Sequence, residues 1–509
     1  MTSRILGLVR DQVLASMFGA RDAMDAYNVA FRVPNLVRDL FAEGAMSAAF
    51  VPTFTRHLTT EGKPAAWKLG NNVVNALIVV SAVVVLAGMV FAAPLVTAMA
   101  SEYASVPGKL ELTILLTRIM LPFLTLVALA AALMGMLNSL HRFFIPALSP
   151  AMFNVATIVC AVTLVPLMPR LGLAPITAIA IGTLVGGLAQ LAVQWPSLRR
   201  EGFSYRPTLD WRDPGLHRVL VLMGPGTLGL AATQVNIFVN TVLATGQGTG
   251  AVSWLNLAFR LMYLPIGLFG VSIATATLPA VSRHAAKDDT VAVRGTIADG
   301  LSLMLMLNVP ATVGLVVLAV PIVRVIFERG AFTSADTAAT ASALVYYSVG
   351  LVGYSVVRIA SPTFYALGRN RTPVIVSAIA VIANMVLNLA LARVLGYRGL
   401  ALGTSLASLV NAGLLLYLLR QHLGGLEGRR LSVSLAKILA ASAVMGGVAL
   451  LVDGWLESSF PGTNLFRQIV RLSAAIGAAL GTLALAAFVL RIREFHESVG
   501  LVMRRFRRA

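Results

Sequence analysis

Cysteine and charge are both scarce in this sequence of 509 residues. Charged residues make up 12% of the chain, where a soluble domain has about 25%, and Cys160 is the single cysteine. One cysteine excludes an internal disulfide framework and a cysteine-based metal site. The six histidines show no metal-ligand spacing and no Gly-x4-Gly-Lys-Ser/Thr phosphate loop is present, so we expect neither metal chemistry nor ATP hydrolysis.

Acidic residues are fewer than basic ones, 21 against 40, which gives a formal net charge of +19. In a soluble protein this excess would suggest nucleic acid. Here the basic residues lie mostly between apolar runs, which is the topology pattern of a membrane protein, so we expect no nucleic-acid partner. The N-terminus lacks the order of a cleaved signal, and we expect the first helix to start almost at Met1.

Apolar residues dominate instead, at 58% of the chain with a mean hydropathy of +0.83. Repeated apolar runs of about 20 residues indicate an all-α, polytopic membrane protein. The sequence predicts 14 transmembrane helices, at about 2–19, 26–56, 68–100, 110–139, 146–168, 173–198, 216–245, 250–283, 294–320, 338–367, 372–393, 398–420, 433–453 and 466–491.

Basic residues predict the orientation. With the N-terminus in the cytoplasm, the inner loops hold about 24 Lys and Arg and the outer loops about 9. This asymmetry places both termini in the cytoplasm, as an even number of spans requires. We interpret the basic tail at 504–508 as a contact with anionic lipids.

Short matches at a nearly constant offset indicate an internal duplication. Residues 28–32 match 256–260 at an offset of 228, and 140–142 match 367–369 at 227. Six spans per copy give a parallel repeat about a pseudo-twofold axis along the membrane normal, and two such lobes can enclose a transporter cavity. The predicted parts are an N-terminal lobe of six helices (1–198), a cytoplasmic connector (199–215), a C-terminal lobe of six helices (216–422), an appended pair of C-terminal helices (423–495) and a basic tail (496–509).

Ionisable residues gather in the stretch from Ser3 to Phe54, where membrane depth makes each cost at least about 2.5 kcal/mol. Arg4 and Asp11 share a helix face with Arg10 beside it, and the second lobe adds Arg260. Arginine presents a planar fork of donors that suits phosphate oxygens, so this cation excess predicts a cavity for an anion such as pyrophosphate. The second span carries one polar stripe: Asn28, Arg32, Asn35, Asp39 and Glu43.

The alternative is that these arginines only fasten helices by pairing with Asp11, Asp25, Asp39 and Glu43. For Asp39 and Glu43 both interpretations stay open, whereas the excess of cations favours a functional role for Arg4, Arg10 and Arg260. Gly246–Gly250 is expected to be a turn, and Pro265 with Gly267 marks a bending point.

Several closely spaced motifs in this sequence resemble those of a known protein family. The sequence resembles the MurJ (MviN) family of lipid II flippases, within the multidrug/oligosaccharidyl-lipid/polysaccharide exporter superfamily. The matching residues are Ser3-Arg4-x-Leu6-Gly7-x-x-Arg10-Asp11, Phe18-Gly19-Ala20, Asp25-Ala26, Pro34-Asn35-Leu36-x-Arg38, Phe41-Ala42-Glu43-Gly44-Ala45, Phe50-Val51-Pro52 and Arg260-x-x-x-Leu264-Pro265-x-Gly267. In the family a longer lead precedes the Ser3-Arg4 motif.

The resemblance implies a transporter rather than an enzyme, one that moves undecaprenyl-pyrophosphate-linked peptidoglycan precursor between leaflets of the bacterial inner membrane by alternating access. The appended pair would form a groove for the lipid tail. Arginines would bind the pyrophosphate head, and acidic partners would hold them or close an outer gate. The implied cavity residues, with their repeat-related neighbours, are Arg4, Arg10, Arg38, Arg260, Asn28, Arg32 and Asn256, and the partner or gate residues are Asp11, Asp25, Asp39 and Glu43.

Some family members hold sodium with acidic side chains. The corresponding positions here are neutral (Asn240, Asn384, Asn388 and Thr404), so a sodium ion and the membrane potential remain competing driving forces, with no other cofactor expected. Expected partners are lipid II, membrane lipids and proteins of cell-wall synthesis. Three alternatives stay open: a flippase for another polyprenyl-linked oligosaccharide, a drug/cation antiporter, which the arginine excess disfavours, and a non-transporting scaffold.

Overall fold

The computed structural model describes residues 2–38, 46–462 and 464–496, and every regular element in that part of the chain is a helix. The all-helical prediction is therefore confirmed. The chain divides into two compact units, which we describe separately. The first comprises Met1–Ser253 with Arg329–Phe332, and the second comprises Trp254–Glu328 with Thr333–Ala509.

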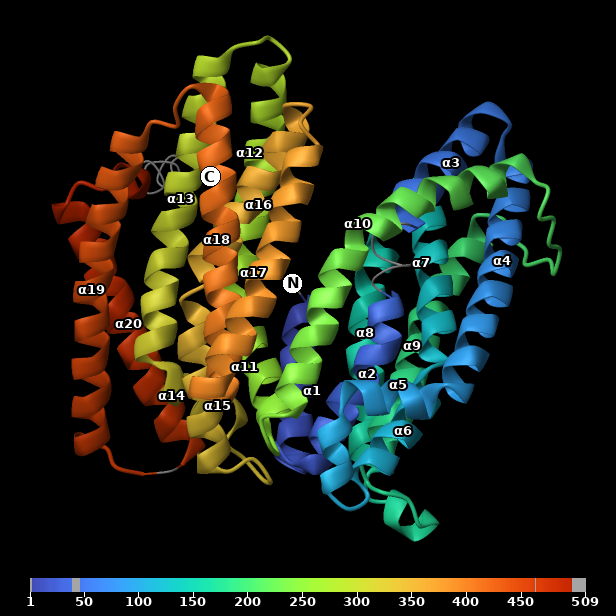
Figure 1. Ribbon diagram of the computed structural model, residues 1–509, viewed down its shortest axis with the longest axis horizontal. Coiled ribbons are helices and arrows are strands. Elements are labelled where there is room, and N and C mark those ends of the chain that lie inside the picture. The colour runs from blue at the N-terminus through green and yellow to red at the C-terminus, as the bar shows by residue number, and fades with distance from the viewer. Residues whose placement is uncertain (1, 39–45, 463, 497–509) are drawn as a thin grey trace. The chain divides into compact units, whose positions relative to one another are not determined.

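The helices of the first unit (Figure 1) pack around two large apolar cores and a smaller third cluster. Helix α8 packs on α1 and α9, while α2 packs on α6, and α3 packs on α7 and α10. Phe50, Phe54 and Met136 are fully buried in one core, and Leu14 and Met120 in the other. The helices are α1 (Thr2–Phe18), α2 (Asp22–Arg38), α3 (Met46–Thr60), α4 (Lys63–Val90), α5 (Ala92–Met99), η2 (Ser101–Ser105), α6 (Lys109–Met120), α7 (Phe123–Ser139), α8 (Phe144–Leu164), η3 (Met168–Leu171), α9 (Thr177–Arg200) and α10 (Pro214–Thr245).

The second unit places its core between α12, α13, α16 and α18. The last two helices pack on each other and on α13 through smaller apolar clusters. At one end of this pair, buried Arg471 contacts Asp453 and Glu457. The helices are α11 (Ala251–Pro265), η4 (Ile266–Gly270), α12 (Val271–Ala285), α13 (Thr290–Val317), α14 (Ala319–Phe327), α15 (Ser334–Ser348), α16 (Leu351–Ala366), α17 (Arg371–Leu395), α18 (Tyr397–Leu423), α19 (Gly428–Ser459) and α20 (Leu465–Val489).

Each predicted span coincides with one helix or with consecutive helices. Within the described residues nine helices are long and apolar enough to cross a membrane, and the pair α15–α16, bent by 42°, makes a tenth. The structure interrupts three spans that we predict as continuous, at Phe91, at Leu121–Pro122 and at Val349–Gly350. Proline explains the second break, because it removes a helix hydrogen bond and clashes with the preceding turn. Pro265, where we expect a bending point, is the last residue of α11 and directly precedes the π-helical η4.

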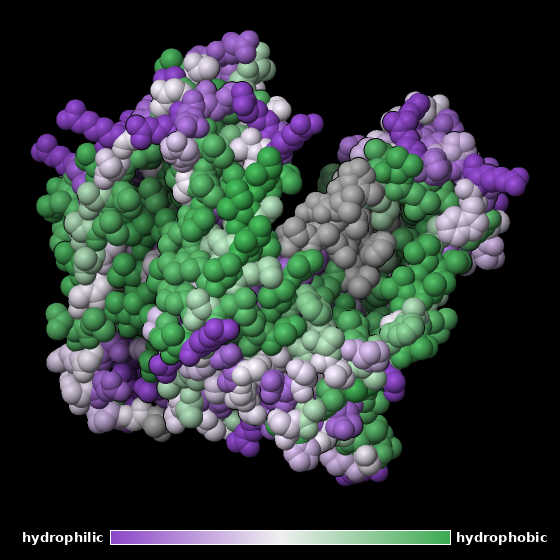
Figure 2. Space-filling view, viewed as in Figure 1, coloured by the Kyte–Doolittle hydropathy of each residue, from purple (hydrophilic) through white to green (hydrophobic). Residues whose placement is uncertain are grey.

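Large hydrophobic side chains cover the outside of the helices, and hydrophilic ones gather at the helix ends (Figure 2). Val386 on α17, Leu451 on α19 and Leu480 on α20 are all exposed. Exposed apolar surface on long helices suits lipid rather than water, so the chain is a multi-pass membrane protein.

Three amides of α4 hold the predicted connector against the first unit. Asn75 Nδ2 donates to the carbonyl oxygens of Arg206 (2.7 Å) and Thr208 (2.9 Å), and its Oδ1 accepts from the hydroxyl of Tyr205. Asn71 and Asn72 each donate a hydrogen bond to a backbone carbonyl oxygen of the connector and accept one from a backbone N–H of the connector. These bonds provide partners for backbone N–H and C=O groups of an irregular segment that has no helix or sheet hydrogen bonds of its own.

The connector also begins with a charged clasp. The carboxylate of Glu201 accepts from Arg142 Nε at 2.8 Å and contacts Lys63 Nζ at 3.3 Å. The hydrogen bond from Arg142 is the main reason that the pKa of Glu201 lies below its usual value. This clasp ties α4, the loop before α8 and the end of α9 together.

Candidate functional site

Arg10 and Asp11 form a buried ion pair on α1. Arg10 Nη2 lies 2.9 Å from Asp11 Oδ1, and the two residues are 7% and 4% exposed. The guanidinium also lies 5.5 Å from the centre of the Phe153 ring on α8, a cation–π distance. Arg10 therefore has an acidic partner, as required by the alternative in which the arginines only hold helices together. Five donors on arginine still leave directions for a further ligand.

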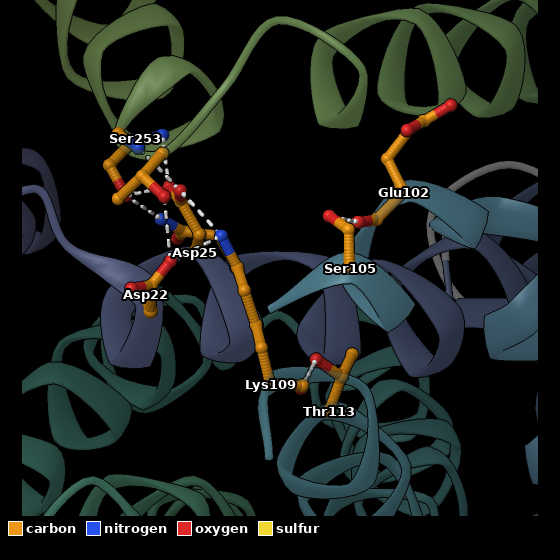
Figure 3. A network of polar contacts seen from close by, with 10 residues as sticks. Asp22, Asp25, Glu102, Ser105, Lys109, Thr113 and Ser253 are labelled. Atoms are coloured by element: carbon orange, nitrogen blue, oxygen red, sulfur yellow. Dashed lines mark hydrogen bonds and ion pairs between the residues drawn. The ribbon is translucent and has the colours of Figure 1, made fainter. Parts of the chain in front are cut away.

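Asp25 is the centre of a second buried network, which Figure 3 shows from close by. Its carboxylate is fully buried at the start of α2 and accepts from Gly250 N (2.6 Å), Ser253 N (3.1 Å) and Ser253 Oγ (2.7 Å). The predicted turn at Gly246–Gly250 is confirmed, since it lies between α10 and α11. Its last residue supplies one of these donors. Asn28 of α2, one turn on, donates to Ser253 Oγ.

The cation of this network is Lys109, at the first position of α6. Lys109 Nζ lies 2.7 Å from Asp22 Oδ1 and 3.5 Å from Asp25 Oδ2, and 4.0 Å from the centre of the Tyr103 ring. The cation that pairs with Asp25 in this structure is therefore a lysine. Sequence reasoning missed Lys109, because a basic residue just before an apolar run is typical of an exposed loop.

Asp22 completes the network on its exposed side. Its Oδ1 also accepts from Thr249 Oγ1 at 2.8 Å, and its side chain is 46% exposed. The network thus joins α2, α6 and the turn before α11 through two carboxylates and one ammonium. Such a buried pair is costly to break, because removing one partner leaves an uncompensated charge.

Residues 329–332 approach the turn that leads into Asp22. Ala331 N donates to Ser16 O at 2.8 Å. Two glycines with left-handed backbone allow this approach. A Cβ on Gly330 (φ +58°) would lie 2.2 Å from Ser16 O, and one on Gly19 (φ +62°) would lie 2.4 Å from Ala331 O. This segment of the first unit is therefore held backbone to backbone against the end of α1.

The remaining predicted residues of the first unit lie on α1 and α2. Arg4 is exposed, whereas Arg32 and Arg38 are half-buried. Asp39 and Glu43 lie outside the described residues. α1 and α2 therefore bring four arginines and three described carboxylates into one unit: Arg4, Arg10, Arg32, Arg38, Asp11, Asp22 and Asp25.

Arg260 and Asn256 lie on α11 in the second unit, the first exposed and the second half-buried. An aromatic cluster surrounds this helix. The ring centre of Phe259 lies 5.8 Å from that of Tyr263 and 5.4 Å from that of Tyr347. The hydroxyl of Tyr263 accepts a hydrogen bond from Arg358. This cluster gives α11 a rigid support that motif reasoning did not reveal.

The structure brings together three of the four residues considered for sodium. Asn384 Nδ2 donates to Thr404 Oγ1 at 3.3 Å, and Asn388 Nδ2 donates to Asn384 Oδ1 at 3.1 Å. Asn240 belongs to the first unit. The trio is neutral and bonds within itself, and no group of three His, Cys, Asp or Glu able to hold a metal occurs among the described residues. A sodium ion held here would rely on amide and hydroxyl oxygens alone, because the trio contains no carboxylate to compensate its charge.

Comparison with known proteins identifies the family. The family model described as "Lipid II flippase MurJ" matches residues 14–470. A "Probable lipid II flippase MurJ" of Vibrio cholerae serotype O1 is 33% identical, with 97% of this chain and 94% of that protein covered. The "Lipid II flippase MurJ" of Burkholderia cenocepacia is also 33% identical, with coverages of 94% and 92%.

Solved structures agree. A "Lipid II flippase MurJ, inward closed conformation" matches with a TM-score of 0.76 at 27% identity, covering 96% of this chain and 97% of that one. A multidrug resistance MATE family transporter of the MOP superfamily shares the fold, with a TM-score of 0.70 at 16% identity over 84% of this chain and 96% of that one. The chain therefore belongs to the MurJ family of lipid II flippases.

Proposed function

We propose that this chain carries lipid II from the inner to the outer leaflet of the bacterial inner membrane, with both termini in the cytoplasm. The observation that carries the proposal is the concentration of arginine on α1, α2 and α11, where Arg4, Arg10, Arg38 and Arg260 match the family motifs. A pyrophosphate diester is doubly ionised and offers several oxygens, which suits multidentate arginine. Arg32, Asn28 and Asn256 add donors on the same helices.

Acidic side chains take two roles in this proposal. Asp11 fixes the guanidinium of Arg10, so that its remaining donors face a constant direction. Asp25, with Lys109 and Ser253, holds α2, α6 and the α10–α11 turn together and closes the outer end of the first unit. For the first unit to open outward, the groups of this network must exchange their hydrogen bonds with one another for hydrogen bonds with water. Asp39 and Glu43, which lie outside the described residues, complete the set of candidate partners.

The lipid tail is assigned to the appended pair. A cavity of about 470 Å³ lies among α13, α14, α19 and α20. Its lining is apolar and includes Leu315, Ile322, Met445, Leu480 and Phe495. An isoprenoid chain suits such a surface, because it packs against apolar side chains by van der Waals contact and leaves no polar group without a partner.

For the driving force we propose the membrane potential. Moving one elementary charge across 100 mV is worth about 2.3 kcal/mol, and an anionic headgroup moving outward follows a potential that is negative inside. The neutral trio of Asn384, Asn388 and Thr404 supports this choice over sodium. Replacing external and internal sodium by choline should leave translocation unchanged, whereas collapsing the potential should slow it.

Complementation tests the function. Cells depleted of their own lipid II flippase should survive on the wild-type chain and fail on Arg260→Gln at equal expression. Arg283→Gln, an exposed arginine of α12 in the same unit, is the matched control and should support growth. Growth on Arg260→Gln equal to wild type would favour a scaffold over a transporter.

A further inference from the structure

A basic cavity of about 660 Å³ lies at one end of the appended pair, and none of the arginines proposed to bind the pyrophosphate lines it. It is formed by the first turns of α19 and by the residues that follow α20, all within the second unit. Five basic side chains line it, together with two carboxylates and one serine: Arg429, Arg430, Lys437, Arg491, Arg493, Glu427, Glu494 and Ser434.

The carboxylates of this cavity already have partners. Arg430 donates to Glu427 at 2.9 Å and also pairs with Asp299 of α13. Glu494 is buried and accepts from Ser434 Oγ at 2.9 Å. Five basic side chains face two carboxylates in the lining, so the cavity carries an excess of positive charge.

The start of α19 carries cations where a helix favours anions. Glu427, at the N-cap, has left-handed backbone (φ 51°) and makes no capping bond with its side chain. Arg429 and Arg430 occupy the first turn, next to the positive end of the helix dipole. Basic residues at this end are unfavourable unless an anion lies nearby.

The far wall is fixed by a second unusual backbone. Arg491 has φ 49°, a backbone conformation that favours glycine and that other residues rarely adopt. The next residue, Ile492, is buried against Ile438 and Ala441, and its N–H bonds Ala487 O at 2.9 Å. This anchor holds Arg491 and Arg493 at the cavity, so the strained position serves to present a guanidinium.

We infer that this cavity binds the phosphate group of an anionic ligand, supplied either by the headgroup of a membrane phospholipid or by a soluble phosphate. The position favours the lipid source on one observation. Phe495, two residues after Arg493, lines the apolar cavity proposed above for the lipid II tail, so the same short segment borders both a cationic and an apolar surface, and phospholipid acyl chains bound here would share that cavity. An anionic phospholipid presents its phosphate and acyl chains in this order.

The test uses the purified full-length protein in detergent with three probes: dioctanoyl-phosphatidylglycerol, dioctanoyl-phosphatidylcholine and inorganic phosphate. The variant is Arg429→Gln with Arg491→Asn, because asparagine tolerates the left-handed backbone and keeps the turn. The matched control is Arg199→Gln with Arg200→Gln, two exposed arginines at the end of α9 in the first unit. Lys437→Gln, within α19, is a second variant that touches no special backbone.

Thermal unfolding and native mass spectrometry should show phosphatidylglycerol binding to wild type and to the control alike. Affinity should fall at least tenfold in the double variant and severalfold in Lys437→Gln. Phosphatidylcholine should bind at least tenfold more weakly than phosphatidylglycerol. If inorganic phosphate raises the unfolding temperature as much as phosphatidylglycerol does, the site binds a soluble phosphate. Retention of full phosphatidylglycerol affinity by the double variant, or absence of any phosphate-dependent binding in wild type, would overturn the inference. This outcome is independent of which precursor the chain carries.

Discussion

Replacing Asp25 by Asn keeps the side-chain shape at the start of α2 and removes one buried negative charge. In the wild type one carboxylate oxygen accepts from both donors of Ser253, and the other accepts from Gly250 N and faces Lys109. An amide has one accepting oxygen, so one of these pairs of donors must face an NH₂ group.

The magnitude follows from the bonds that are lost. A hydrogen bond to a charged acceptor is worth about 1.5–3 kcal/mol, and two are lost, while Lys109 keeps only its 2.7 Å contact with Asp22. We expect Asp25→Asn to destabilise the first unit by about 3–5 kcal/mol, close to the usual cost of breaking a buried pair. Asp22→Asn is the matched comparison, because Asp22 is half exposed and Lys109 would keep the buried Asp25 as its counter-ion, so this change should cost less than Asp25→Asn.

The assay reports opening as well as stability. Cys160→Ala leaves a cysteine-free chain, and Ala251→Cys then places one thiol at a fully buried position beside the network. Asp25→Asn should raise the rate at which a membrane-impermeant maleimide labels this thiol and should lower the unfolding temperature. If Asp25→Asn shows the labelling rate and unfolding temperature of Asp22→Asn, the network does not close the first unit and the reasoning is refuted.

Three further perturbations have defined outcomes. Asn75→Ala should cost about 2–3 kcal/mol in the free energy of unfolding, because each lost connector bond contributes about 1 kcal/mol, and limited proteolysis should then cut the connector sooner. Gly330→Ala should lower the unfolding temperature more than Gly172→Ala, since both have left-handed backbone but only the first would place a Cβ against a backbone oxygen, and equal shifts would contradict this. Because the pKa of Glu201 is lowered in the folded state, its clasp stabilises the protein above the unfolded pKa and is lost as pH falls through the folded pKa. The stability difference between wild type and Arg142→Gln should therefore be largest near neutral pH and vanish in acid, as pH-dependent unfolding would show.

Helices and local motifs could be predicted from the sequence because their signals are local. The apolar runs placed every span on a helix, and the glycines of 246–250 correctly indicated a turn. The Arg10–Asp11 pair could also be anticipated, since the two residues are adjacent. The alternating-access cavity, the pseudo-twofold repeat and the predicted lobe boundaries stay predictions.

Long-range partners could not be predicted, because nothing local distinguishes them. Lys109 is 84 positions from Asp25 and looks like an exposed loop charge, yet it is buried. Helix α10 packs on α3 in the first unit, although the two helices are far apart in the sequence. The left-handed Arg491 gives no sequence signal either, since glycine usually marks such positions.

Translocation by arginine variants tests the central claim most directly. Arg10→Gln alone would leave Asp11 as a buried unpaired charge, so the informative variant is Arg10→Gln with Asp11→Asn, which removes the pair as a whole. With labelled lipid II in liposomes that sustain a membrane potential, this double variant and Arg260→Gln should each lose at least tenfold in translocation rate while unfolding at the wild-type temperature. Wild-type translocation by both would contradict an arginine site for the pyrophosphate.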